Sequence, residues 1–115
     1  MCGSGARFDG CCGPLLEGEP APTPERLMRS RYTAFVRGDV AHLLRTWHPR
    51  TRPAELTIDP AMRWHGLDVV DTAADGDTGV VEFRARWSDG DEKGVLHERS
   101  TFARRGGRWL YVAAE

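Results

Sequence analysis

The sequence has little net charge and no long apolar segment, and both absences narrow the class of protein. Seventeen acidic residues oppose sixteen basic ones, for a formal net charge of -1, so no charge excess predicts binding to nucleic acid or to an anionic membrane. No apolar run reaches the roughly 18 residues that span a bilayer, and the first residues lack the basic-then-apolar plan of a secretory signal. We therefore expect a cytoplasmic protein without nucleic-acid or membrane partners.

Cysteine is also scarce, and it is confined to one end of the chain. Cys2, Cys11 and Cys12 all lie within the first twelve of 115 residues. An odd number cannot pair completely within one chain, and adjacent cysteines have Cα atoms only about 3.8 Å apart, closer than usual disulfides allow. In a reducing cytosol, such a cluster favours metal ligation or free thiols over structural disulfides.

Familiar catalytic and phosphate-binding motifs are lacking too. No spacing of serine and histidine indicates a nucleophile with its base. Gly3 and Gly5 are followed by cysteines rather than by a helical pattern, so they do not predict a phosphate-binding loop. His97 and Glu98 are neighbours on a predicted strand, where their side chains point to opposite faces. The sequence therefore contains no assembled catalytic set.

Residues 23–49 carry the pattern of two amphipathic helices. Thr23 is a good N-cap and Pro24 suits the first helical position, where its missing N–H is not needed. Gly38 ends this helix, Asp39 can cap the next one, and Pro49 stops it. The apolar residues recur at helical spacing, at positions 28, 32, 35 and 36 and then at 40, 43, 44 and 47.

From residue 64 onward the apolar period changes to two, which is typical of strands. Strands are predicted over residues 64–70, 80–87, 96–102 and 109–112, with turns at 75–77, 89–91 and 106–107. The glycine- and proline-rich residues 1–22 are expected to be irregular. Helices followed by hairpin-connected strands predict an α+β fold, in which two helices pack on one face of an antiparallel four-stranded sheet.

The first residues resemble the SEC-C motif, a short zinc-binding element. Its pattern is Cys-x-Cys-x-Ser-Gly, a spacer, and then Cys-Cys or Cys-His, which the segment CGSG at 2–5 and the pair at 11–12 match in part. The remainder is similar to the YchJ-like family, bacterial proteins that carry this motif before a nuclear-transport-factor-2-like domain. The matching segments are TPERLMRSRYTAF (23–35), TWHP (46–49), WHGL (64–67), LHERSTF (96–102) and GRWLYV (107–112).

The resemblance implies a SEC-C-like segment over residues 1–22 and, over 23–115, a curved sheet wrapped against helices to form a cone. It also implies zinc bound by Cys2, Cys11 and Cys12, although a closed tetrahedral site needs four ligands. The motif places a further cysteine two positions before Cys2. Three explanations stay open: the natural start lies upstream, the α-amine of Cys2 becomes the fourth ligand once Met1 is removed, or the site is degenerate.

A cone of this kind often encloses a pocket. Residues expected near it are Tyr32, Trp47, Trp64, Glu98 and Trp109. Glu98 shares its predicted face with apolar residues, so we expect either a raised pKa or an arginine partner, with Arg84 and Arg86 on the neighbouring strand as candidates if their face matches. His48 is expected to cap a helix end, or alternatively to be a fourth metal ligand or a base in the pocket.

Three functions compete at this point. The first is a non-enzymatic, zinc-dependent module for protein interaction or metal handling. The second is a pocket that binds or turns over a small molecule, with Glu98 as acid or base. The third is a thiol redox sensor, in which Cys2 would react rapidly at neutral pH.

Overall fold

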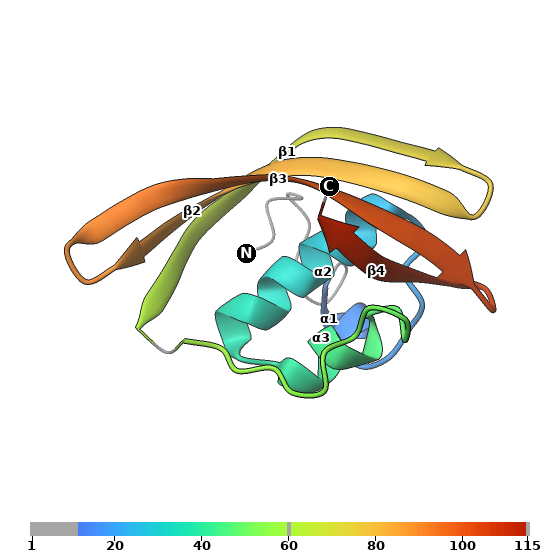
Figure 1. Ribbon diagram of the computed structural model, residues 1–115, viewed down its shortest axis with the longest axis horizontal. Coiled ribbons are helices and arrows are strands. Elements are labelled where there is room, and N and C mark those ends of the chain that lie inside the picture. The colour runs from blue at the N-terminus through green and yellow to red at the C-terminus, as the bar shows by residue number, and fades with distance from the viewer. Residues whose placement is uncertain (1–11, 60, 115) are drawn as a thin grey trace.

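An arched antiparallel sheet covers a layer of helices. The computed structural model describes residues 12–59 and 61–114, which contain α1 (Cys12–Leu16), α2 (Pro24–Arg37), α3 (Val40–Arg45), β1 (Met62–Asp75), β2 (Thr78–Asp89), β3 (Glu92–Arg105) and β4 (Arg108–Ala114). The strand order is β1-β2-β3-β4, and every neighbouring pair is antiparallel. All the helices lie beneath the concave face of the sheet (Figure 1). The predicted α+β fold is confirmed.

The caps of α2 and α3 are those that the sequence predicts. The Thr23 side chain accepts a hydrogen bond of 3.1 Å from the N–H of Arg26, and Gly38, at φ 74°, closes α2 in the left-handed conformation that glycine adopts readily. The Asp39 side chain then accepts from the N–H of His42 at 3.0 Å. These local bonds fix where α2 ends and α3 begins.

The chain after α3 turns away from the helix earlier than Pro49 and joins the sheet. Trp47 and Tyr111 form a parallel bridge, in which the N–H of His48 donates to Tyr111 O and the N–H of Tyr111 donates to Thr46 O, both at 2.8 Å. Residues 46–48 therefore lie along the outer edge of β4. This pairing replaces the last turn that the pattern predicts for the second helix.

The core lies between α2 and the concave face of the sheet. Leu27, Met28 and Tyr32 of α2 are buried there. The sheet contributes the inward-facing residues of the predicted two-residue period, which are Leu67, Val81, Phe83, Ala85, Phe102 and Trp109. No helix in the described residues is long and apolar enough to cross a bilayer.

The segment before α2 is more ordered than its glycine and proline content suggests. Residues 12–16 form the short helix α1, and Leu15 and Ala21 are 4% and 7% exposed within the core. Arg45 donates to Leu16 O and Arg108 donates to Gly18 O, both at 3.0 Å. A helix of five residues is too short to show an apolar period in the sequence. Packing against the rest of the domain, rather than helix propensity, stabilises it.

Candidate functional site

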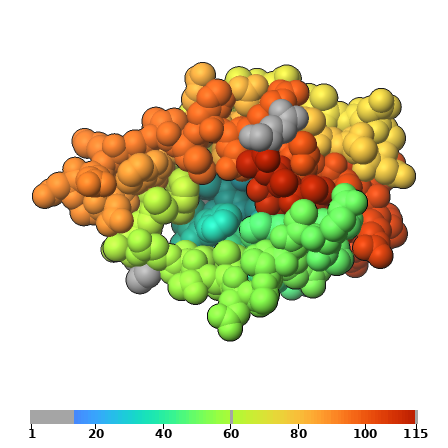
Figure 2. Space-filling view, in the orientation of Figure 1, coloured from blue at the N-terminus to red at the C-terminus, as the bar shows by residue number. Residues whose placement is uncertain are grey.

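A cavity of about 330 Å³ lies between α2, Trp47 shortly after α3, and the concave face of the sheet. Its lining residues are Met28, Arg31, Tyr32, Phe35, Trp47, Met62, Trp64, Phe83, Ala85, Leu96, Glu98 and Tyr111. In Figure 2 the surface is hollowed at this place, with α2 at the floor and with β3, the start of β1, the segment after α3 and β4 around the rim. The cavity is thus open on one face.

Aromatic residues make up half of the residues that line the cavity. Trp64 meets Tyr32 edge-on, with ring centroids 6.2 Å apart, and Phe35 at 6.4 Å. In the same lining, Trp47 meets Tyr111 edge-on at 5.1 Å. Small-molecule sites typically have such apolar, aromatic walls with few polar groups.

Arg31 is the buried charge of this cavity, since only 3% of the residue is exposed. Its Nη1 donates to Leu43 O at 2.8 Å and to Thr46 Oγ1 at 2.7 Å. The guanidinium carbon also lies 5.0 Å and 4.5 Å from the ring centroids of Trp47 and Tyr111, within the range of cation–π attraction. Burial lowers the pKa of Arg31 to about 10, with Tyr111 and Glu98 acting in the opposite direction, so the side chain stays charged at neutral pH.

Glu98 brings a half-buried carboxylate to the same cavity. Its Oε2 accepts a hydrogen bond of 2.7 Å from Ser100 Oγ. Burial raises the pKa of Tyr111, and the negative charge of Glu98 raises it further. Arg31, Glu98 and Tyr111 therefore form the polar part of a mainly apolar cavity.

The prediction that Arg84 or Arg86 is the partner of Glu98 is wrong. Glu98 is paired with Phe83 in the β2–β3 register, whereas Arg84 is paired with His97. The side chains of Arg84 and Arg86 therefore lie on the other face of the sheet, where Arg86 forms an ion pair with Asp68. The arginine that faces Glu98 comes from α2 instead, which strand periodicity cannot reveal.

Four of the five expected pocket residues, Tyr32, Trp47, Trp64 and Glu98, line this one cavity. Trp109 does not line it. Trp109 is 5% exposed in the core, near Arg104, whose guanidinium carbon lies 5.2 Å from the indole. Tyr111, two residues further along the same face of β4, reaches the cavity instead.

Arg31 is the candidate site residue that the sequence patterns did not single out, although a signal was present. The residue adjoins Tyr32 and lies between the apolar positions 28 and 35, so a charged side chain occupies the core-facing side of α2. Arginine is rarely buried without partners. A charge at that place on the helix therefore indicates a buried polar site.

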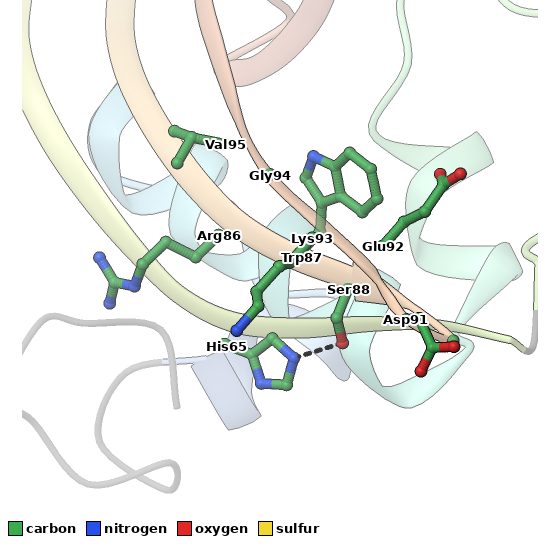
Figure 3. A pocket seen from close by; sticks show the side chains of 10 residues that line it. His65, Arg86, Trp87, Ser88, Asp91, Glu92, Lys93, Gly94 and Val95 are labelled. Carbon is green, nitrogen blue, oxygen red and sulfur yellow. Dashed lines mark hydrogen bonds between the residues drawn. The ribbon is translucent and has the colours of Figure 1, made fainter.

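A second hollow, of about 590 Å³, lies at the far end of the β2–β3 hairpin. Figure 3 shows Trp87 near Gly94, a hydrogen bond of 2.7 Å between His65 Nε2 and Ser88 Oγ, and charged hairpin residues around the rim. A Cβ at Gly94 would lie 2.9 Å from the Trp87 ring, so glycine is what lets the indole lie on β3. The charged groups here are exposed, and the cavity beneath the sheet is the stronger candidate because it contains a buried charge.

The predicted zinc ligands cannot be placed. Cys2 and Cys11 lie outside the described residues, and for Cys12, which opens α1, only the backbone is described. Within the described residues, 12–59 and 61–114, no group of three His, Cys, Asp or Glu side chains is placed so that it could hold a metal ion. His48 Nδ1 accepts a hydrogen bond of 3.1 Å from the N–H of Arg50, so it caps a turn rather than the carbonyls of a helix.

The arched sheet, the helices on its concave face and the cavity between them define a nuclear-transport-factor-2-like domain. The family model for "YchJ, middle NTF2-like domain" matches residues 23–114. A UPF0225 protein of Streptomyces coelicolor is 54% identical, and the match covers 99% of this chain and 92% of that protein. The chain belongs to the YchJ (UPF0225) family, as its resemblance predicts.

Two solved structures are similar in both fold and sequence. A SEC-C motif containing protein from Rhodopseudomonas palustris, solved in solution, has a TM-score of 0.90 and 36% identity, covering 98% of this chain and 94% of that one. A crystal structure of a SEC-C motif containing protein from Psychrobacter arcticus has a TM-score of 0.79 and 28% identity, covering 93% and 71%. The relatives thus include proteins with the motif that the first twelve residues resemble.

Proposed function

We propose that this protein is a binding module for a small, mainly apolar molecule held in the cavity beneath the sheet. The buried guanidinium of Arg31 inside an aromatic wall supports this proposal. Its Nη1 is occupied by Leu43 and Thr46, whereas its Nε and Nη2 have no hydrogen-bond partner in the part of the chain that the structure describes. Neither nitrogen is among the fully buried side-chain atoms that lack a partner in the described residues, so both keep some open space around them, and a bound molecule could accept hydrogen bonds from them.

The test is a ligand screen by NMR, followed through the indole N–H signals of Trp47 and Trp64. Compounds that bind should shift both signals, and Ala85→Leu should weaken their binding at least tenfold because its larger side chain extends into the cavity. Ala74→Leu, at an exposed position of β1, is the matched control and should have no effect. A screen without such compounds, or binding that Ala85→Leu leaves unchanged, would contradict the proposal.

Turnover in the cavity would require an acid or base, and Glu98 is the residue available for it. Its Oε1 has no partner among the described residues. If a bound compound is converted, Glu98→Gln should abolish conversion while the compound still binds. Conversion that persists in this variant would exclude Glu98 from the chemistry.

A second proposed function, metal-dependent protein interaction or metal handling, rests on the N-terminal cysteines and on the SEC-C motif relatives. Thiolates bind Zn²⁺ strongly. We expect purified full-length protein to carry zinc, and the double variant Cys11→Ser with Cys12→Ser to lose it. Less than about a tenth of an equivalent of zinc in the unmodified protein would contradict a structural zinc site, which is occupied when folded.

Alkylation separates this role from that of a redox sensor. Zinc-bound thiolates are shielded, so Cys2 should react slowly with iodoacetamide until a chelator is added. Fast reaction of Cys2 at neutral pH, unchanged by the chelator, would instead support the sensor.

A further inference from the structure

We infer that the group recognised at the polar part of the cavity is uncharged and carries adjacent hydrogen-bond acceptor and donor atoms, as a carboxamide or lactam does. The acceptor would bind Arg31 and the donor would bind Glu98. This inference rests on the proposed binding function and names the class of ligand for that same cavity.

The first step of the argument is the spacing of the two charges. Arg31 of α2 and Glu98 of β3 both line the cavity, and the charge of Glu98 opposes the lowering of the Arg31 pKa by burial. They nevertheless form no direct ion pair in the part of the chain that is described. The guanidinium and the carboxylate are therefore not in direct contact, and the ligand group that we infer would lie between them.

The second step is the set of polar atoms that these two side chains leave without a partner among the described residues. Arg31 keeps Nε and Nη2 as donors, and Glu98 keeps Oε1 as an acceptor, since their other polar atoms are bound to Leu43, Thr46 and Ser100. Guanidinium can only donate and carboxylate can only accept. A bridging group must therefore offer an acceptor on one side and a donor on the other.

The third step is charge balance. A carboxylate ligand would gain from Arg31 but would be repelled by Glu98, and an ammonium ligand would have the reverse problem. Each adds a third charge to a site whose own two charges sum to zero, and burying an unbalanced charge is expensive. A neutral amide satisfies both side chains without adding charge.

The fourth step is the remainder of the cavity, which is apolar. Tyr32, Phe35 and Trp64 lie in aromatic contact on one side of it, and such rings favour a planar aromatic partner. The volume of about 330 Å³ corresponds to on the order of ten non-hydrogen atoms at about 30 Å³ for each water-sized group. Benzamide is a probe of this size and chemistry.

The experiment compares benzamide with benzoate and benzylammonium, which share the ring and differ in charge. Full-length protein is titrated with each compound, and the indole N–H signals of Trp47 and Trp64 are followed by NMR. We expect the dissociation constant of benzamide to be at least fivefold below those of the other two. Tighter binding of benzoate or benzylammonium, or failure of all three to bind, would overturn the ligand class, whereas the binding function itself is decided by the broader ligand screen and by Ala85→Leu.

A variant tests whether Glu98 determines the preference for a neutral ligand. Glu98→Gln removes the opposing charge, so the preference should move from benzamide to benzoate, with benzoate binding at least fivefold more tightly than before. Glu92→Gln, exposed at the start of the same strand, is the control and should keep the original order. An unchanged order in Glu98→Gln would mean that Glu98 does not contact the ligand, and the inference would fail.

Discussion

Arg31 ties α2 to the end of α3 as well as lining the cavity. The two hydrogen bonds from its Nη1 reach Leu43 O and Thr46 Oγ1, which lie where α3 ends and the chain turns toward β4. Charged donors make stronger hydrogen bonds than neutral ones. At the scale of single residues, the Arg31 side chain therefore both stabilises the contact between α2 and α3 and lines the candidate site.

The stability part can be measured with Arg31→Met, which keeps the length of the side chain and removes its donors. We expect the free energy of unfolding in urea to fall by about 2 to 4 kcal/mol, because the buried acceptors at Leu43 and Thr46 lose a charged partner. Arg105→Met, at an exposed position, should change it by less than about 0.5 kcal/mol. Equal losses in the two variants would contradict a structural role for Arg31.

His42 is a buried histidine for which the sequence indicates no partner. The residue is 1% exposed, and its hydrogen bonds define its tautomer. Arg45 can only donate, so Nδ1 accepts its bond of 3.1 Å. Nε2 then carries the proton and donates to Ser30 Oγ at 3.0 Å, and Ser30 donates to Leu27 O at 2.7 Å. The imidazole is therefore neutral in the folded protein.

This arrangement predicts loss of stability in acid. Burial, followed by the charge of Arg45, lowers the pKa of His42 from 6.5 to about 4. Between these values the unfolded chain binds a proton that the folded protein does not, so stability falls as the pH drops from 6.5 to 4, by up to about 3 kcal/mol.

Urea unfolding of His42→Gln over this pH range checks the sign and the source. The variant starts from lower stability but should lose less of it on acidification than the unmodified protein. His65→Gln, where the histidine is exposed, should follow the unmodified protein. Parallel pH curves for all three would contradict the assignment to His42.

At the scale of elements, the bend of β1 depends on Gly66. The β1–β2 register shifts between Trp64 and Gly66, and Gly66 has a φ of 155°, which side chains rarely allow. The guanidinium of Arg86 occupies the space that a Cβ would take. The bulge lets the start of β1 curl toward the helices, where Trp64 completes the cavity wall.

Gly66→Ala should therefore cost about 1 to 3 kcal/mol, part of it from the backbone and part from displacing Arg86. Arg86→Ser alone should cost less than about 1 kcal/mol, because its ion pair with Asp68 is exposed. In a double-mutant cycle by urea unfolding, the combined loss should be smaller than the sum of the two. Strict additivity would mean that the backbone alone sets the cost at Gly66.

At the scale of the whole molecule, the N-terminal segment and the sheet share one core. The predicted boundary after residue 22 stays a prediction, but Leu15 and Ala21 pack among the core residues on the near side of it. Leu15→Ala should lower the free energy of unfolding by about 2 to 4 kcal/mol. Circular dichroism and tryptophan fluorescence should still report one coincident transition; an earlier, separate transition would show that the segment unfolds independently.

The sequence predicts well the features that depend on residues close together along the chain. The caps at Thr23, Gly38 and Asp39 join residues three or four apart, and the hairpins close through short turns, so both follow from local chemistry. The placement of Arg31 and Glu98 in one cavity does not follow from local chemistry. It depends on how far the sheet arches over α2, which is set by twist and by the bulge at Gly66. Strand alternation identifies the face of Glu98 but not the helix residue opposite it.

The bridge between Trp47 and Tyr111 also gives the sheet two unlike edges. An unpaired strand edge is a template on which another chain can add a strand. Residues 46–48 cover part of this template on β4, while β1 carries register shifts before Gly66 and Asp71 and acidic side chains at Asp68 and Asp71. Irregularity and charge both oppose strand addition. The same bulge that shapes the cavity therefore protects the protein from aggregating through its open edge.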